Sequence, residues 1–173
     1  MRGMRHAGFS LLELVVVVIA VAILAGFALD RLLPLVGRAQ RAAFLTMQAD
    51  LQTALLLEAA ERITRGEADS LPELAQTNPM ALLLKPPANY VESPADDTQI
   101  PPASWYYDED AHRLGYRVGR YTRFKAGDGP ADRIELTVAF VYQDRNGDGQ
   151  FDAAGDRFDG LRLTPVHAYE WPD

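Results

Sequence analysis

The chain has 173 residues, no cysteine and a formal net charge of −7 at pH 7. This length leaves room for one small domain beside an apolar N-terminal segment. The acidic balance argues against a nucleic-acid partner, because phosphate contacts need clustered Lys and Arg. The absence of cysteine excludes disulfides, thioether-linked haem and cysteine-based zinc sites.

An apolar segment covers residues 9–29, and its only polar side chains are those of Ser10 and Glu13. A helix needs roughly 20 such residues to cross a bilayer, so we expect a transmembrane helix here. A carboxylate inside a membrane span costs several kcal/mol. Glu13 is therefore a candidate functional residue.

Residues 1–8 precede this segment, carry Arg2 and Arg5, and end in Gly8. A secretory signal peptide would have its small-residue cleavage site after the apolar region, where this chain offers only a weak one. Cleavage after Gly8 would instead leave the apolar helix on the mature protein, with Phe9 as the new N-terminus. We therefore expect residues 1–8 to be a leader peptide.

The stretch Gly8-Phe9-Ser10-Leu11-Leu12-Glu13-Leu14, between a short basic leader and an aliphatic helix, resembles the prepilin N-terminus of type IV pilins and of type II secretion pseudopilins. The resemblance is close over about the first third of the chain. It implies that a prepilin peptidase cuts between Gly8 and Phe9 and methylates the Phe9 amine. It also implies that Glu13 meets the Phe9 amine of a neighbouring subunit, which would give a buried carboxylate the opposite charge it needs.

The positive-inside rule does not settle the orientation of the span. Arg2 and Arg5 precede it, whereas Arg31, Arg38 and Arg41 follow it within the distance that the rule counts. The family resemblance implies a cytoplasmic leader, a single pass through the inner membrane and a periplasmic head that later joins a pilus or pseudopilus filament.

The helix is expected to continue over residues 30–66 as an amphipathic helix, with Gly66 as its C-cap. Apolar residues recur there every four positions, at Leu51, Leu55, Ala59 and Ile63. Pro34 and Gly37 interrupt the junction between the two halves, where a kink or local melting is expected. In pilin-like filaments the corresponding region can lose helical structure, so the resemblance makes Pro34 and Gly37 a candidate hinge. A kink without functional consequence is the alternative.

Residues 67–173 are expected to form a connecting loop and an antiparallel sheet. The part before residue 103 is rich in Pro, Asp, Asn and Ser and is interpreted as an ordered surface connection with brief helical turns near residues 71–74 and 80–84. Strands are expected at 105–108, 114–118, 134–142 and 157–166. The apolar face of the 38–65 helix can cover one face of this sheet, so the predicted fold is α+β and pilin-like.

The segment 144–156 carries oxygen side chains at alternate positions and a Gly after the third, which is typical of a loop that binds a calcium ion. It departs from the EF-hand pattern because Gly155 stands where that loop has its bidentate Glu. The alternative is a metal-free hairpin, since Asn-Gly and Asp-Gly pairs favour tight turns. By resemblance, major pseudopilins bind calcium near the C-terminal part of their sheet. The candidate calcium ligands are Asp144, Asn146, Asp148, the Gln150 carbonyl, and Asp152 or Asp156.

The sequence holds no Ser-His-Asp arrangement, His cluster or Gly-rich phosphate loop, so an enzyme is not expected. The leading hypothesis is a structural subunit of a type IV pilus-like filament, whose partners are the prepilin peptidase, the inner membrane and other pilin subunits. Residues 54–90, with Trp105-Tyr106-Tyr107-Asp108 and Tyr116-Arg117-Val118, look similar to minor pilins of the mannose-sensitive haemagglutinin type. A type II secretion pseudopilin is a close alternative. A signal-anchored periplasmic binding or sensor module is the alternative from another class.

Overall fold

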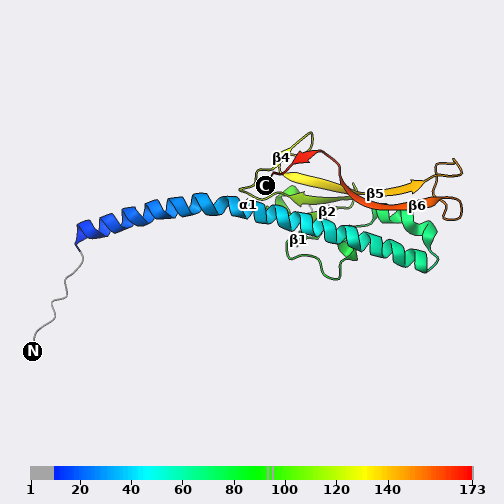
Figure 1. The fold of residues 1–173 in the computed structure, drawn as a ribbon, viewed down its shortest axis with the longest axis horizontal. Coiled ribbons are helices and arrows are strands. Elements are labelled where there is room, and N and C mark those ends of the chain that lie inside the picture. The colour runs from blue at the N-terminus through cyan, green and yellow to red at the C-terminus, as the bar shows by residue number, and fades with distance from the viewer. Residues whose placement is uncertain (1–9, 93, 95, 173) are drawn as a thin grey trace, which may run out of the picture.

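A single helix, α1 (Leu11–Thr64), dominates the computed structural model, which describes residues 10–92, 94 and 96–172. It has 54 residues and is helical throughout. Its N-terminal half projects from the molecule, and its C-terminal half lies along the head (Figure 1). The helix ends where the sequence predicts, because Gly66 adopts a φ of 77° just after the C-cap residue Arg65.

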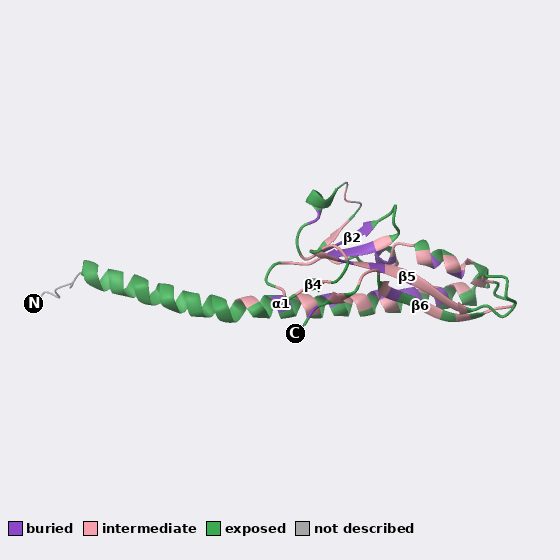
Figure 2. Ribbon diagram, turned by 90° about the horizontal axis from the view of Figure 1, so that it is seen from above, coloured by how far each residue is buried: buried purple, intermediate pink, exposed green. Residues whose placement is uncertain are grey.

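Only the second half of α1 packs against other elements. All side chains from Ser10 to Leu32 are exposed, whereas buried positions recur at helical spacing from Gly37 onward (Figure 2). The predicted positions Leu51, Leu55 and Ala59 are buried, but Ile63 is 47% exposed at the last turn. We call the buried positions of α1 the buried row: Gly37, Phe44, Leu51, Leu55 and Ala59.

The main sheet has five strands in the order β1-β2-β3-β5-β6. The four predicted strands are present, and their neighbours pair antiparallel. The prediction of a purely antiparallel sheet is wrong, because β1 pairs with β2 in parallel. The strand β1 has only two residues and therefore no alternation that the sequence could reveal. The bounds are β1 (Tyr90–Val91), β2 (Ser104–Asp108), β3 (Arg113–Arg117), β5 (Arg133–Gln143) and β6 (Arg157–Pro165).

A second, two-stranded sheet joins β4 (Lys125–Ala126) to β7 (Tyr169–Glu170). Neither strand is among the four that the sequence predicts. The difference arises because β4 finds its partner in the C-terminal segment, far away along the chain. This small sheet brings the C-terminal segment towards α1, where the Arg41 side chain donates a hydrogen bond to the Trp171 carbonyl at 2.6 Å.

The core lies between one face of the main sheet and the buried row of α1. Two 3₁₀ helices, η1 (Ala68–Gln76) and η2 (Pro79–Leu82), cover the rest of that face. Leu71, Leu74 and Met80 in these helices are no more than 1% exposed. The predicted surface connection is therefore partly core, since its scattered apolar residues pack together only after the chain folds back on the sheet.

The opposite face of the sheet holds the segment between β1 and β2 by charge-assisted hydrogen bonds. Arg133 binds both carboxylate oxygens of Asp97 at 2.7 and 2.9 Å, and Arg117 donates to the Ile100 carbonyl at 2.6 Å. The hydrogen bond from Arg133 holds the pKa of Asp97 below its ordinary value. These contacts fasten η3 (Asp97–Gln99) against the sheet.

Gln52 of α1 fixes the position of the helix along the edge strand β6. Its side-chain amide donates to the Leu161 carbonyl at 2.7 Å and accepts from the Leu163 N–H at 2.9 Å. One side chain thereby satisfies two backbone groups at an open edge of the sheet. The sequence shows Gln52 only as a polar position beside the apolar face.

The junction at Pro34 and Gly37 is continuous in this structure, and α1 curves gently there without a sharp kink (Figure 1). Close packing explains the glycine at position 37, because a Cβ there would lie 2.4 Å from the Tyr121 carbonyl oxygen. The glycine lets the loop between β3 and β4 approach the helix backbone. The hinge role of Pro34 stays a hypothesis about the filament.

We predict that Gly37→Ala lowers the thermal stability of the head in detergent, because the new methyl group pushes the 119–124 loop away from α1. Overpacking of this kind costs about 1–3 kcal/mol. Gly26→Ala is the matched control, since a Cβ there meets nothing within 4 Å. Unfolding followed by near-UV circular dichroism should show a lower midpoint for Gly37→Ala only. Equal midpoints would contradict the packing role of Gly37.

Candidate membrane and assembly site

The N-terminal half of α1 is long and apolar enough to cross a membrane. Among the described residues it provides the one helix of this kind, and its apolar part is not buried within the molecule. At 1.5 Å per residue, the helix from Leu11 to Asp30 spans about 30 Å, the thickness of the hydrocarbon core of a bilayer.

The start of α1 is a capped helix terminus. Ser10 is the N-cap, and its Oγ accepts a hydrogen bond from the Glu13 N–H at 3.2 Å. This Ser-x-x-Glu spacing is typical of a capping box. The sequence therefore also indicates that Glu13 helps to start the helix, beside its expected role in assembly. Gly8 and Phe9, the predicted processing residues, lie outside the described residues.

Glu13 stands exposed on this apolar surface. Its neighbours along the helix, Leu12 and Leu14, are also exposed, at 74% and 57%. Within the described part of the chain, the Glu13 carboxylate has no ion-pair partner. A carboxylate at the start of a helix is favoured by the helix dipole, but in a lipid environment it still needs a cation.

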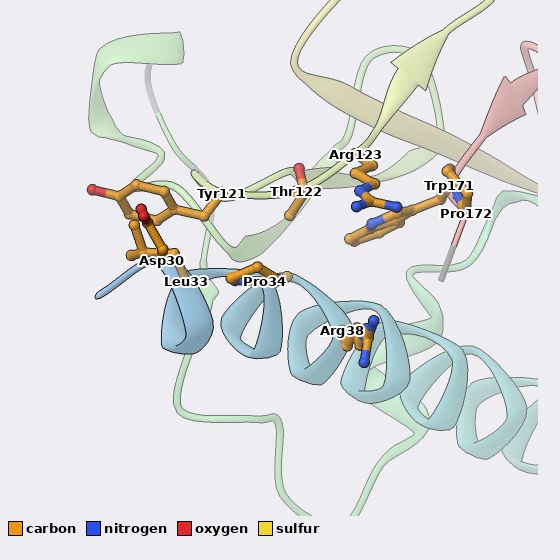
Figure 3. Close-up of a pocket in the computed structure, with 10 residues that line it drawn as sticks. Asp30, Leu33, Pro34, Arg38, Tyr121, Thr122, Arg123, Trp171 and Pro172 are labelled. Carbon is orange, nitrogen blue, oxygen red and sulfur yellow. The ribbon is translucent and has the colours of Figure 1, made fainter. Parts of the chain in front are cut away.

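A cleft of about 330 Å³ lies where α1 leaves the head (Figure 3). One wall is α1, including the candidate hinge residues Pro34 and Gly37. The other wall is the 119–124 loop with Tyr121 and Arg123, and Trp171 lies beside them. The sequence gives no sign of this cleft, because it depends on the approach of the loop to Gly37.

The acidic loop at residues 144–156 connects β5 to β6 at the opposite end of the head (Figure 1). Its carboxylates accept hydrogen bonds from the backbone of the loop itself. Asp144 accepts from the Gly147 and Gly149 N–H groups at 2.6 and 2.9 Å, and Asp148 accepts from Gln150 at 2.8 Å. The carboxylates of the loop thus hold its backbone in shape.

Asp156 closes the base of this loop. Its two oxygens accept hydrogen bonds from the backbone N–H groups of Arg145 and Asp152, at 2.9 and 3.0 Å, and these bonds hold the pKa of Asp156 below its ordinary value. The Ala153 N–H also donates to Asp69 of η1 at 3.0 Å. The loop is therefore closed at its base and tied to η1.

The predicted calcium ligands lie together in this loop and make hydrogen bonds within it. Over residues 10–92, 94 and 96–172, no group of three or more His, Asp or Glu side chains is arranged to hold a metal ion. Asn146 instead donates to Asp148 at 3.0 Å, and Asp152 accepts from the Ala154 N–H. Calcium binding at these residues stays a prediction.

We predict that calcium raises the melting temperature of the full-length protein in detergent relative to the chelator-treated protein. A ligand at a hundredfold its dissociation constant stabilises by about 2.7 kcal/mol. Asp148→Ala should abolish the shift, whereas Asp50→Ala, an exposed acid on α1, should preserve it. An unchanged melting temperature of the wild type would leave the metal-free hairpin as the correct interpretation.

Comparison of this chain with protein-family models, with curated proteins and with solved structures finds no match. Its fold class is α+β, with one long apolar N-terminal helix and a small mixed sheet. What the chain does must be inferred from its own residues and their arrangement.

Proposed function

We propose that this chain is a structural subunit of a type IV pilus-like filament. The first half of α1 holds it in the inner membrane with the head in the periplasm, prepilin peptidase removes residues 1–8, and the apolar helix then packs among other subunits. The observation that supports this most is the projecting half of α1, which is unpartnered in the described structure and, from Leu11 to Leu29, is apolar except for Glu13 near its capped start.

The apolar side chains lie all round the helix, which fits a helix that passes from lipid into a filament. A helix that packs on one partner is apolar on one stripe, whereas a helix that is apolar all round is completely surrounded. The segment from Leu14 to Leu29 exposes large apolar side chains on every side. Lipid can surround such a helix before assembly, and equivalent helices of other subunits can do so afterwards.

Glu13 supplies the specific contact in this proposal. Cleavage after Gly8 would create an amine on Phe9, one residue before the N-cap Ser10. Among apolar helices, the Glu13 carboxylate and a neighbouring subunit's Phe9 amine satisfy each other's need for an opposite charge. The uninterrupted α1 then links the position of this ion pair to the position of the head.

Two closely related roles share this mechanism: a minor pilin of the mannose-sensitive haemagglutinin type and a pseudopilin of type II secretion. A signal-anchored periplasmic module is the alternative outside the class. In that alternative Gly8 and Glu13 have no function, so changing either residue would affect neither processing nor assembly.

We predict that Gly8→Leu blocks removal of residues 1–8, because a peptidase that recognises a small residue cannot accommodate the larger side chain. The intact mass of the membrane protein should then be that of the uncleaved chain. The wild type should lose residues 1–8 and gain one methyl group, only in cells that have a prepilin peptidase. Gly3→Leu, in the same leader, is the matched control and should be processed. A Gly8→Leu protein that still begins at Phe9 would refute the assignment.

We predict that Glu13→Val leaves cleavage intact and lowers incorporation into filaments. An unpaired buried amine costs about 3 kcal/mol, which corresponds to roughly a hundredfold loss in the assembly equilibrium. The measurement is the fraction of subunit in sheared filaments relative to the membrane. Glu13→Asp should restore part of it, and Asp50→Asn on the same helix should behave as wild type. Wild-type incorporation of Glu13→Val would count against the charge pair.

A further inference from the structure

Four exposed arginines surround the point where α1 leaves the head. Arg31 and Arg38 belong to α1, and Arg120 and Arg123 belong to the loop between β3 and β4. We call these four residues the basic collar. Within the described part of the chain none of them forms an ion pair with a carboxylate. Most other arginines of the head do form such pairs: Arg62, Arg65, Arg113, Arg117, Arg133 and Arg157.

The basic collar lies at the depth of lipid headgroups. If the helix from Leu11 to Asp30 crosses the hydrocarbon core, Arg31 is the next residue, and Arg38 follows about 10 Å further along the axis. A bilayer of about 40–45 Å with a core of about 30 Å leaves a headgroup layer of roughly this depth on each side. The close contact between Gly37 and the Tyr121 carbonyl brings the other two arginines to the same level.

The cleft at this junction combines charge with apolar surface (Figure 3). Arg38 and Arg123 line it from its two walls, and Leu33 and Trp171 contribute apolar surface. Its lining includes one carboxylate, that of Asp30. A site with two guanidinium groups beside apolar surface matches a phosphodiester attached to acyl chains better than a free inorganic anion.

Tyr121 also suits the headgroup layer of a membrane. It adopts a φ of 65°, which is costly for a residue with a side chain, and its ring is 60% exposed beside Asp30 at the mouth of the cleft (Figure 3). Tyrosine is enriched where membrane proteins meet the headgroup layer, because its ring is apolar and its hydroxyl is polar. An exposed tyrosine at this level of the helix is suited to that layer.

We propose that this cleft binds the headgroup of an anionic phospholipid in the leaflet facing the head, with the phosphate between Arg38 and Arg123. The acyl chains follow the exposed apolar surface of α1 below Leu33. The positive-inside rule does not account for the arginines that follow the span, whereas binding of an anionic lipid gives them a function. The inference requires that α1 cross a bilayer, but it does not depend on filament assembly.

The test is retention of lipid by the full-length protein. Protein extracted in mild detergent from vesicles of phosphatidylcholine and phosphatidylglycerol at three to one is measured by native mass spectrometry. We expect monomers to retain phosphatidylglycerol in preference to phosphatidylcholine. Each arginine near an anionic surface contributes roughly a fivefold effect, so Arg38→Gln/Arg123→Gln should lower this preference roughly twenty-five-fold.

Three further variants serve as controls for this experiment. Lys85→Gln/Arg162→Gln removes the same charge from exposed positions elsewhere on the head and should leave retention unchanged. Asp30→Asn removes the acid from the cleft and should increase retention, so the proposal remains testable if the double variant folds poorly. Glu13→Val, which is expected to assemble poorly, should retain as much phosphatidylglycerol as the wild type.

Three results would overturn the proposal. Equal retention of the two lipids by the wild type would remove the headgroup preference. Displacement of the lipid by millimolar inorganic phosphate would identify a site for free anions. Retention that occurs only in oligomers and is lost from monomers would assign the basic collar to contacts between copies of this chain. Failure of assembly in Glu13→Val with lipid retention intact separates this inference from the proposed function.

Discussion

The packing of the buried row of α1 on the main sheet is the contact on which the rest of the molecule depends. Phe44, Leu51 and Leu55 are at most 1% exposed, and they meet Leu114, Leu136 and Leu161 of the sheet in the same core. A small sheet has little stability alone, so one face must be covered. Apolar contacts alone do not fix the register of the helix on the sheet. Gln52 fixes it, since its two hydrogen bonds to β6 permit only one position of the helix along the strand.

An aromatic cluster extends this contact towards the end of the head where α1 leaves it. The ring of Phe44 stacks on Trp105 with centroids 5.2 Å apart and packs against Trp171 at 5.5 Å. Trp171 in turn lines the cleft at the junction. The C-terminal segment is therefore held by the same residues that anchor α1, and the proposed lipid site is built on a rigid part of the head.

The charges of the molecule are distributed unevenly along α1. The basic collar surrounds the end of the apolar segment, while the acidic 144–156 loop lies at the opposite end of the head (Figure 1). If the proposed span is correct, the arginines lie close to the membrane surface, where anionic lipids attract them, and the acidic loop lies beyond the reach of that surface charge.

The sequence by itself determined the elements whose signal is local. The apolar span, the end of α1 at Gly66 and the alternation of β5 follow from composition and period, because side chains of one helix or strand share a face at fixed spacing. Only the tertiary structure decided the parallel pairing of β1, the burial of Leu71 and Met80, and the cleft beside Gly37. These features depend on segments that are far apart in the chain. No local sequence pattern indicates which distant segments will come into contact.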